Sequence, residues 1–401
     1  MSLRRRLFKA LHPARQVTSG NQITLLCNGA DYFPALLNAL SAANQSIRLE
    51  TYLYADDAIG QMVTQALCDA AQRGVDVRLV VDGFGARNIG IHHLPLLQQA
   101  GVHVRIFRPE HHLWRHLLSR KRSRLRRMHR KMALCDGHTA FVGGINIIDD
   151  ATGNPSPMRP DFALRIRGPL LHEIGHAIDR QWQTLSRRPI LHQSQKPAPT
   201  RIDCPLAGNV RAALALRDNL LNRGQIEAAY ISAIERAQQE ITLAMAYFIP
   251  SRAILHALLN AAQRGVEIRL LLQGRIEYRL QHYASQSLYT RLLTAGIQIY
   301  EYEPGFMHAK VGVIDREWST VGSANLDPFS LLVAREANVL VFDEGFCNKL
   351  KQHLLAEIQG HSKEITTATW AQRSGWQRML RALSARILFR LLSLTRYTNN
   401  Y

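Results

Sequence analysis

The 401-residue chain has no run of about 18 consecutive apolar residues, so no membrane-spanning helix is expected. Its five cysteines are scattered and none forms a C-x-x-C pair, which indicates free thiols in a reducing compartment and argues against a disulfide framework. The N-terminus carries arginines without an apolar segment after them, so it is not expected to be a secretory signal.

Acidic residues are scarce relative to basic ones. Lys and Arg number 50 against 31 Asp and Glu, which gives a formal net charge of +19. A charge of this size attracts polyanions, and its sign alone does not choose between nucleic acid and an anionic membrane surface. Hydrophobic residues make up 46% of the chain, which is enough for two globular units with sizeable cores.

The sequence contains an internal duplication. The segment A-A-Q-R-G-V occurs at 70–75 and again at 261–266, each time after a helix-like stretch (roughly 57–73 and 251–264) and before an apolar strand-like run. Alternating helix and strand periods predict α/β layers with a parallel or mixed sheet. We therefore predict a tandem-duplicated α/β fold, whose two units have mixed sheets and pack about a pseudo-twofold axis.

Composition predicts the boundaries of these units. The basic amphipathic tail carries apolar residues at helical spacing, interrupted by arginines, so it can either lie in lipid headgroups or pack on the protein itself. The predicted segments are a basic N-terminal segment (1–20), a first unit (21–186) with a basic insertion (109–128), a polar linker (187–208), a second unit (209–360) and the tail (361–401).

One motif, H-x-K-x4-D-x6-G-[GS]-x-N, occurs once in each unit, and every member of the second copy lies 179 positions after its counterpart. Two such copies in register are not expected by chance in a chain of ordinary composition. The first copy contains His129, Lys131, Asp136 and Asn146, and the second contains His308, Lys310, Asp315 and Asn325.

The spacing within the motif has a chemical meaning. Residues 129–135 alternate like a strand, so His129 and Lys131 share a face. Packing about a pseudo-twofold axis would bring both histidines, lysines and asparagines to one pocket, where Lys and Asn donate to phosphate oxygens. One histidine then attacks phosphorus and the other transfers protons. Because lysines neutralise the charge, no metal or other cofactor is expected. Asp161 and Glu336 are the candidate acids that orient the histidines.

These residues resemble the phospholipase D superfamily, whose mark is a doubled H-x-K-x4-D motif. More narrowly, the chain resembles bacterial cardiolipin synthases, in particular their short B form without membrane-spanning helices. The resemblance covers roughly 21–360 and implies a bilobed fold with the active site between the halves. The matching stretches are L-E-T-Y-L-Y (49–54), M-H-R-K (128–131), F-V-G-G-I-N (141–146), A-Y-F-I-P (246–250) and V-G-S-A-N-L-D-P-F-S-L (321–331).

The resemblance also implies roles and a reaction. His129 would be the nucleophile that forms a phosphohistidine, and His308 the general acid and base, with Asp136 and Asp315 completing the catalytic motif in a more structural role. The phosphatidyl group would move from phosphatidylglycerol to a second phospholipid alcohol, with release of glycerol. The acceptor and the oligomeric state stay open. The implied phosphate-binding residues are Lys131, Lys310, Asn146 and Asn325, and the implied His-orienting residues are Asp161 and Glu336.

The basic insertion precedes the first motif and has no counterpart in the second unit. Its cations alternate with Leu and Trp, a pattern typical of segments that bind anionic lipid. We therefore expect a peripheral membrane protein on the cytoplasmic face of the bacterial cell membrane. The predicted membrane-binding residues are Trp114, Arg120, Lys121, Arg122, Arg124, Arg126 and Arg127.

Three alternatives compete with a lipid transferase. A phosphodiesterase of the same fold acting on nucleic acid would also suit the charge, and its binding would depend strongly on salt. A non-catalytic membrane-binding protein is disfavoured by two intact motifs. Finally, L-H-E-I-G-H-A (171–177) has the H-E-x-x-H spacing of zinc peptidases. No third ligand is marked after His172, Glu173 and His176, so we interpret this stretch as a surface helix and expect no metal there.

Overall fold

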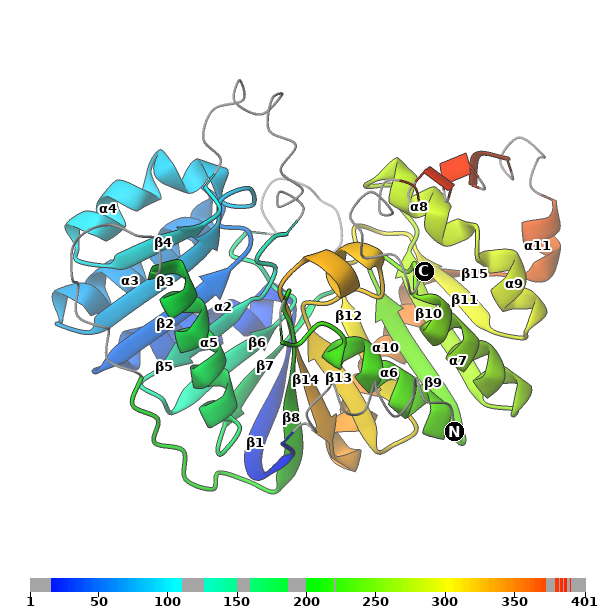
Figure 1. Cartoon of the computed structure of the whole chain (residues 1–401), viewed down its shortest axis with the longest axis horizontal. Coiled ribbons are helices and arrows are strands. Elements are labelled where there is room, and N and C mark those ends of the chain that lie inside the picture. The colour runs from blue at the N-terminus through cyan, green and yellow to red at the C-terminus, as the bar shows by residue number, and fades with distance from the viewer. Residues whose placement is uncertain are drawn as a thin grey trace.

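A computed structural model describes residues 16–109, 126–149, 159–186, 200–219 and 221–372, with short helical pieces between 379 and 390. The chain forms two α/β units that lie side by side (Figure 1). Both units follow the same element order: alternating strands and helices first, then three strands and a closing helix. The duplication read from the sequence is therefore also a duplication of topology.

The first unit begins at β1 and ends at α5. Its strands are β1 (Thr18–Cys27), β2 (Ser46–Thr51), β3 (Asp76–Asp82), β4 (His103–Phe107), β5 (Met132–Cys135), β6 (Thr139–Gly143) and β7 (Phe162–Arg167). Its helices are α2 (Asn28–Ala42), α3 (Ala58–Gln72), the 3-10 helix η1 (Arg87–Gly90), α4 (His93–Gln99) and α5 (Leu171–Ser186).

The second unit repeats this order and adds elements after its closing helix α10. Its strands are β8 (Val210–Arg217), β9 (Glu240–Met245), β10 (Glu267–Gln273), β11 (Gln298–Tyr302), β12 (Lys310–Ile314), β13 (Trp318–Gly322), β14 (Glu336–Phe342) and β15 (Ser362–Ile365). Its helices are α6 (Gln225–Arg236), α7 (Arg252–Gln263), α8 (Arg279–Gln286), α9 (Tyr289–Thr294), the π-helix η4 (Phe329–Val333), α10 (Glu344–His361) and α11 (Thr367–Ala371).

The described strands form one mixed sheet in the order β15-β11-β10-β9-β12-β13-β14-β8-β1-β7-β6-β5-β2-β3-β4. Within each unit three neighbouring strands are parallel and the others antiparallel. The units join where β1 pairs antiparallel with β8, and β13 and β14 also contact β6 and β7. This arrangement confirms the predicted tandem α/β fold with mixed sheets.

Each unit has an apolar core on the sheet face that its α2–α3 or α6–α7 helix pair covers. In α2, Phe33, Leu36 and Leu40 follow helical spacing and are buried, which is what an amphipathic helix on a sheet requires. A third core extends through both units between α5 and α10, and it includes Leu164 of β7 and Val339 of β14. Apolar packing thus fixes the two units to each other.

The repeated A-A-Q-R-G segment ends a helix in both units. Asp57 and Ser251 cap the starts of α3 and α7 by accepting bonds from backbone amides inside the first turn. Both helices then end before a glycine with positive φ, +89° at Gly74 and +86° at Gly265, a conformation that favours glycine. These helices lie where the sequence predicted them.

Several predicted segments lie wholly or largely outside the described residues: most of the basic insertion, most of the linker and most of the tail. In the part of the chain that the structure describes, no helix combines the length and apolar character needed to cross a membrane.

Candidate active site

His129 meets an acid from the opposite unit. Its backbone N–H donates to the carbonyl of Arg335 over 2.9 Å, just before β14 begins. Its ring Nδ1 lies 3.1 Å from Oε2 of Glu336, whose side chain is fully buried. The second unit therefore holds the histidine of the first.

The second histidine repeats this contact in the other direction. The backbone N–H of His308 donates to the carbonyl of Pro160 over 2.9 Å, and its Nδ1 lies 2.6 Å from Oδ2 of Asp161. Both candidate acids thus contact a histidine, and in each case the histidine of the other unit. With Nδ1 engaged, Nε2 is the ring nitrogen that can face a substrate.

The regular strand in each motif is shorter than the sequence predicted. The alternation over 129–135 predicted that His129 and Lys131 lie within one strand, but β5 begins at Met132, and in the second unit β12 begins at Lys310. The residues before β5 instead form a bridge to the other unit, where Met128 pairs with Arg335. At His129 the backbone is therefore bonded to the other unit and not to a strand of its own unit.

Both motif lysines are buried beside their histidines. Lys131 is 3% exposed and its Nζ donates to the carbonyl of His129 over 2.8 Å, while Lys310 is fully buried and donates to the carbonyl of His308. Each Nζ retains further donors, since an ammonium group has three. A buried ammonium without a full set of partners favours an anion in its vicinity.

The motif asparagines connect the site to the loops after β2 and β9. Oδ1 of Asn146 accepts from the N–H of Leu53 over 3.2 Å, and Oδ1 of Asn325 accepts from the N–H of Tyr247 over 3.3 Å. These bonds orient each amide so that its NH2 group can donate elsewhere.

The pKa values of the lysines indicate that both belong to one cationic cluster. Burial lowers the pKa of Lys131 to about 7, and the positive charge of Lys310 adds to this effect. Burial also lowers the pKa of Lys310 to about 8, with a further contribution from Arg159. Since like charges raise the free energy of one another, a bound phosphate would relieve both.

The pKa values of both motif histidines are lowered, which favours the neutral rings. Burial lowers the pKa of His129, although the carboxylate of Glu336 opposes the shift. Burial lowers the pKa of His308 further, and the charges of Lys310 and Arg159 act in the same direction. His129 is itself among the groups that shift the pKa of His308, which indicates that both rings share one electrostatic environment.

The two orienting acids differ in their ionisation. Burial raises the pKa of Asp161 to about 6, against the opposing charge of Lys310. Burial is the largest influence on Glu336 and acts to raise its pKa, but His129, Lys131 and Ser323 together outweigh it, so the pKa of this carboxyl is lowered. Glu336 is therefore the stronger partner for a positive charge on its histidine.

The motif aspartates lie at the other end of their strands, away from the histidines. Both have positive φ, +52° at Asp136 and +51° at Asp315. The carboxylate of Asp136 accepts three backbone N–H bonds of 2.8 Å, from 44, 45 and 46, and that of Asp315 accepts the equivalent three, from 238, 239 and 240. These bonds attach the start of β2 to the turn after β5, and the start of β9 to the turn after β12.

Four residues that the sequence analysis did not single out also belong to the site. The ring of Tyr52 packs edge-on against His129 with centroids 4.8 Å apart, and Ser323 Oγ donates to Glu336 Oε2 over 2.5 Å. A side chain at Gly144 would collide with Asp161, since an added Cβ would lie 2.1 Å from its Oδ1. The fourth residue is Arg159, whose positive charge lowers the pKa values of His308 and Lys310. Gly144 and Ser323 occupy the [GS] position of the motif, and Tyr52 lies in the matching stretch 49–54, so these three had a signal in the sequence.

Two of the predicted membrane-binding residues lie within the described structure. The guanidinium of Arg127 lies 3.6 Å from buried Asp82 and stacks 4.9 Å from the Phe84 ring, while the carbonyl of Arg126 accepts a bond from Arg108. The contacts of Arg127 are internal to the protein. The predicted residues from Trp114 to Arg124 lie outside the described residues.

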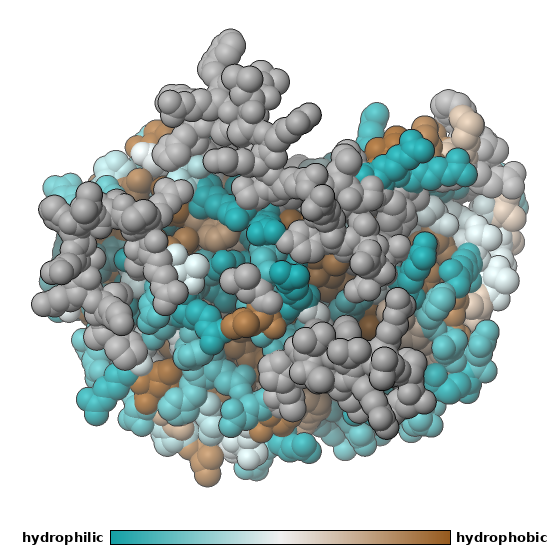
Figure 2. All heavy atoms as spheres, in the orientation of Figure 1, coloured by the Kyte–Doolittle hydropathy of each residue, from teal (hydrophilic) through white to brown (hydrophobic). Residues whose placement is uncertain are grey.

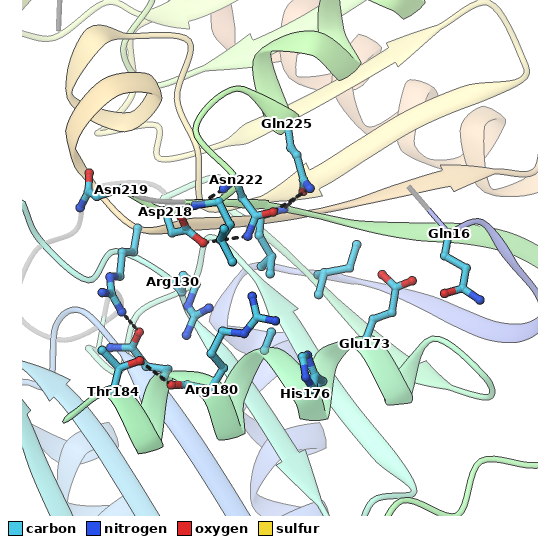
Figure 3. A pocket seen from close by; sticks show the side chains of 16 residues that line it. Gln16, Arg130, Glu173, His176, Arg180, Thr184, Asp218, Asn219, Asn222 and Gln225 are labelled. Atoms are coloured by element: carbon cyan, nitrogen blue, oxygen red, sulfur yellow. Dashed lines mark hydrogen bonds between the residues drawn. The ribbon is translucent and has the colours of Figure 1, made fainter. Parts of the chain in front are cut away.

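The H-E-I-G-H stretch lies on α5, as the interpretation of a surface helix predicted. His172 and His176 are exposed, and Figure 3 shows Glu173 and His176 facing a cavity of 340 Å³ between α5 and the segment after β8. The histidines, lysines, aspartates and asparagines of the paired motif do not line this cavity. Its wall contains Arg130 and Arg335, which are adjacent in sequence to His129 and Glu336. Among described residues, no group of three or more His, Cys, Asp or Glu is placed to hold a metal.

Comparison with solved structures places the fold in a known class. The chain superimposes on phosphatidylserine synthase from Haemophilus influenzae Rd KW20 with a TM-score of 0.68, covering 98% of this chain and 100% of that one at 13% identity. It also superimposes on polyphosphate kinase from Porphyromonas gingivalis with a TM-score of 0.57 at 16% identity, covering 93% of this chain and 53% of that one. Together with the paired motif, the fold defines a two-unit phospholipase D-like protein.

Sequence comparison gives the family. The family model described as "Cardiolipin synthase, PLD-like domain" matches residues 36–156 and 230–358. Cardiolipin synthase B of Escherichia coli (strain K12) is 33% identical over 89% of this chain and 85% of its own length. Cardiolipin synthase A of Pseudomonas aeruginosa (strain LESB58) is 32% identical over 87% of this chain and 69% of its own length. The chain belongs to the cardiolipin synthase family of PLD-like proteins.

Proposed function

We propose that this protein is a phosphatidyltransferase that moves a phosphatidyl group from phosphatidylglycerol to a second phospholipid alcohol and releases glycerol. The observation that carries the proposal is the crossed pair of contacts, His129 with Glu336 and His308 with Asp161, around two buried lysines. Such an arrangement suits transfer of a phosphodiester through a histidine. Membership of the family supports a phospholipid as the substrate.

In the first step His129 attacks phosphorus. Burial lowers the pKa of this ring and so favours its neutral form, and with Nδ1 bound to Glu336 the lone pair of Nε2 is available. A nitrogen–phosphorus bond forms and the bond from phosphorus to the glycerol oxygen breaks. His308 gives a proton to that oxygen. The bound phosphodiester contributes a negative charge beside His308 and so offsets the cations that lower its pKa in the empty site.

In the second step the hydroxyl of another phospholipid loses its proton to His308 and attacks phosphorus. The nitrogen–phosphorus bond breaks, His129 becomes neutral again, and the product is cardiolipin when the acceptor is phosphatidylglycerol. Water in place of the acceptor would give phosphatidic acid. Throughout both steps Lys131, Lys310 and the two motif asparagines donate to the non-bridging oxygens, where negative charge develops. We assign Asp136 and Asp315 a structural role, since their carboxylates bind backbone amides.

We also propose that the protein binds the membrane surface at its cytoplasmic face. Support comes from the helical pieces after 379, which lie at the edge of the second unit beside α8 (Figure 1). Met379, Leu383 and Ile387 recur every four residues and are 51%, 48% and 41% exposed, while Arg381 is buried against Trp370. Hydrophobic residues are visible at this edge in Figure 2. A helix docked through its cation thus presents an apolar stripe outward, as interfacial helices do.

The proposal is tested with purified protein in EDTA, incubated in separate reactions with phosphatidylglycerol vesicles and with single-stranded DNA. Mass spectrometry should find cardiolipin and glycerol in the first reaction and intact DNA in the second. The variants His129→Ala and His308→Ala should form neither cardiolipin nor glycerol. Cut DNA with unchanged lipid would support the nuclease alternative and overturn the proposal.

A further inference from the structure

A second cavity, of 310 Å³, lies between the first turns of α2 and α3. Apart from Asn28, Asp149 and Arg159, its walls are apolar or glycine. Cavities of this size and polarity are typical of sites for apolar parts of small ligands. The apolar walls include Ala30, Phe33, Pro34, Leu37, Ile59 and Met62.

The cavity lies at the same edge of the sheet as the active site. Helix α2 starts directly after the carboxyl end of β1, and α3 follows the short loop after the carboxyl end of β2, which carries the N–H that binds Asn146. Asn28 is bound to Asp161 twice: its N–H donates to the Asp161 carbonyl over 2.8 Å, and its Oδ1 accepts from the Asp161 N–H over 2.9 Å. One wall of the cavity is therefore bonded to the residue that holds His308.

Arg159 connects the cavity to the phosphate site. It lines the cavity, and its positive charge, after burial and the charge of Lys310, is the next contribution that lowers the pKa of His308. It acts in the same way on Lys310, where only burial and the opposing charge of Asp161 contribute more. Guanidinium groups pair readily with phosphate oxygens. The cavity thus has a cationic end beside the catalytic groups and an apolar body beyond it.

The corresponding place in the second unit contains the protein's own apolar side chains. There η4 follows the motif and adds Leu331 to the core that contains Ile226 and Tyr230 of α6. Asn325 and Glu336 are 11 positions apart, whereas Asn146 and Asp161 are 15 apart. The stretch 149–158 in the first unit reads D-D-A-T-G-N-P-S-P-M, without the Phe, Leu and Val of η4. The two units thus differ in sequence at this position.

We propose that this cavity binds one acyl chain of the phosphatidyl group that is transferred to His129. The inference rests on the proposed function and adds where the lipid lies. A diacylglycerol phosphate has a charged end next to apolar chains, which matches the order of Arg159, the cavity wall and the partly exposed rim at Met62. The chain stays in place through both steps, because the phosphatidyl group leaves His129 only in the second.

The first test places a carboxylate in the cavity. Met62 is 51% exposed, so Met62→Glu should fold, and Ala253→Glu at the equivalent position of α7 is the matched control. We expect Met62→Glu to lower kcat/KM at least about tenfold on dioleoyl phosphatidylglycerol in mixed micelles, because a carboxylate beside an acyl chain loses hydration. On soluble dihexanoyl phosphatidylglycerol, whose chains are too short to extend through the cavity, the change should be less than about twofold.

Vesicle binding is measured in parallel, because a surface effect would imitate this result. Equal losses on both lipids, equal losses in Ala253→Glu, or a loss that follows weaker binding of Met62→Glu to vesicles would overturn the inference and leave the proposed function intact. A wild-type protein that transfers neither lipid would overturn both.

The second test locates the chain directly in the wild-type protein. A phosphatidylglycerol with a diazirine near the end of one acyl chain is irradiated with the protein, and labelled peptides are identified by mass spectrometry. Label is expected in peptides from α2 and α3. Label confined to the equivalent helices α6 and α7, or absent from both pairs while transfer proceeds, would contradict the inference.

Discussion

Glu336 of the second unit lies 3.1 Å from the ring Nδ1 of His129 in the first, and Asp161 of the first unit lies 2.6 Å from Nδ1 of His308 in the second. Each unit therefore supplies one histidine and the acid for the other histidine. Neither unit by itself brings a motif histidine together with its orienting acid.

Replacement of these acids should affect turnover more than binding. Glu336→Gln and Asp161→Asn each remove the charge that stabilises a protonated histidine, so kcat should fall by about 10²- to 10⁴-fold with little change in KM. Glu357→Gln is the matched control, since Glu357 lies 2.9 Å from His361 in a surface pair on α10. Steady-state kinetics with soluble lipid measures these changes. A rise in KM at constant kcat would mean that the acids bind substrate instead of orienting histidines.

The covalent intermediate should be found on the first motif. Quenching during turnover with denaturant at mildly alkaline pH, which preserves the nitrogen–phosphorus bond, followed by digestion and mass spectrometry, should give a phosphatidyl adduct on the peptide that contains His129, and His129→Asn should give none. The expectation follows from the acid beside His129: the pKa of Glu336 is lowered whereas that of Asp161 is raised, so Glu336 is the better partner for a positively charged ring. An adduct on His308 would reverse the two roles.

Activity should decline at moderately alkaline pH. Burial lowers the pKa of Lys131 to about 7 and that of Lys310 to about 8, below the ordinary lysine value of 10.5. Above these values the free protein loses the charges that attract phosphate, so kcat/KM should fall between about pH 7 and 9, since this quantity reports the free enzyme. The profile is recorded with dihexanoyl lipid to exclude membrane binding. A plateau up to pH 10 would contradict the assignment of these lysines.

Loss of a motif aspartate should reduce stability before it reduces catalysis. Asp136→Ala removes three bonds to backbone amides, and we expect the free energy of unfolding to fall by about 1–3 kcal/mol. Asp136→Asn should lose less, because asparagine tolerates the positive φ and keeps an acceptor oxygen. Chemical denaturation gives these differences, and activity per folded molecule at low temperature should stay near that of the wild type. A dead but stable Asp136→Asn would instead argue for a direct catalytic role.

The basic insertion should control binding to anionic membranes. Each cation near such a surface contributes about 1 kcal/mol, so replacing Arg120, Lys121, Arg122 and Arg124 by Ala should weaken vesicle binding by about 10²- to 10³-fold at low salt. Sedimentation with phosphatidylglycerol vesicles measures the effect, and phosphatidylcholine vesicles are the control. If the fourfold variant binds vesicles as the wild type does, the basic insertion is not the membrane-binding segment, and the exposed stripe at Met379, Leu383 and Ile387 is the next candidate.

The sequence predicted the two units, the helices at α3 and α7 and the residues of the paired motif, because period and repetition are local properties. It also named Asp161 and Glu336 as partners of the histidines, but not which acid meets which ring. That choice depends on how the strands of the two units align, which no spacing within one unit encodes. Tyr52 was missed for the same reason, since only packing brings its ring to His129.

The sequence difference between η4 and the stretch 149–158 was visible from the start, but it could be interpreted only once the fold was known. The four extra positions before Asp161 and the lack of large apolar residues there were visible, but their significance depends on the cavity between α2 and α3. Burial had to be known before a difference in composition could be assigned to a binding site.

The antiparallel pairing of β1 with β8 restricts how substrates reach the reaction centre. A hinge-like opening of the two units would break the pairing of β1 with β8 and expose the apolar core that both units share. We therefore expect the two histidines to stay together during turnover, so that substrates enter and products leave without separation of the units.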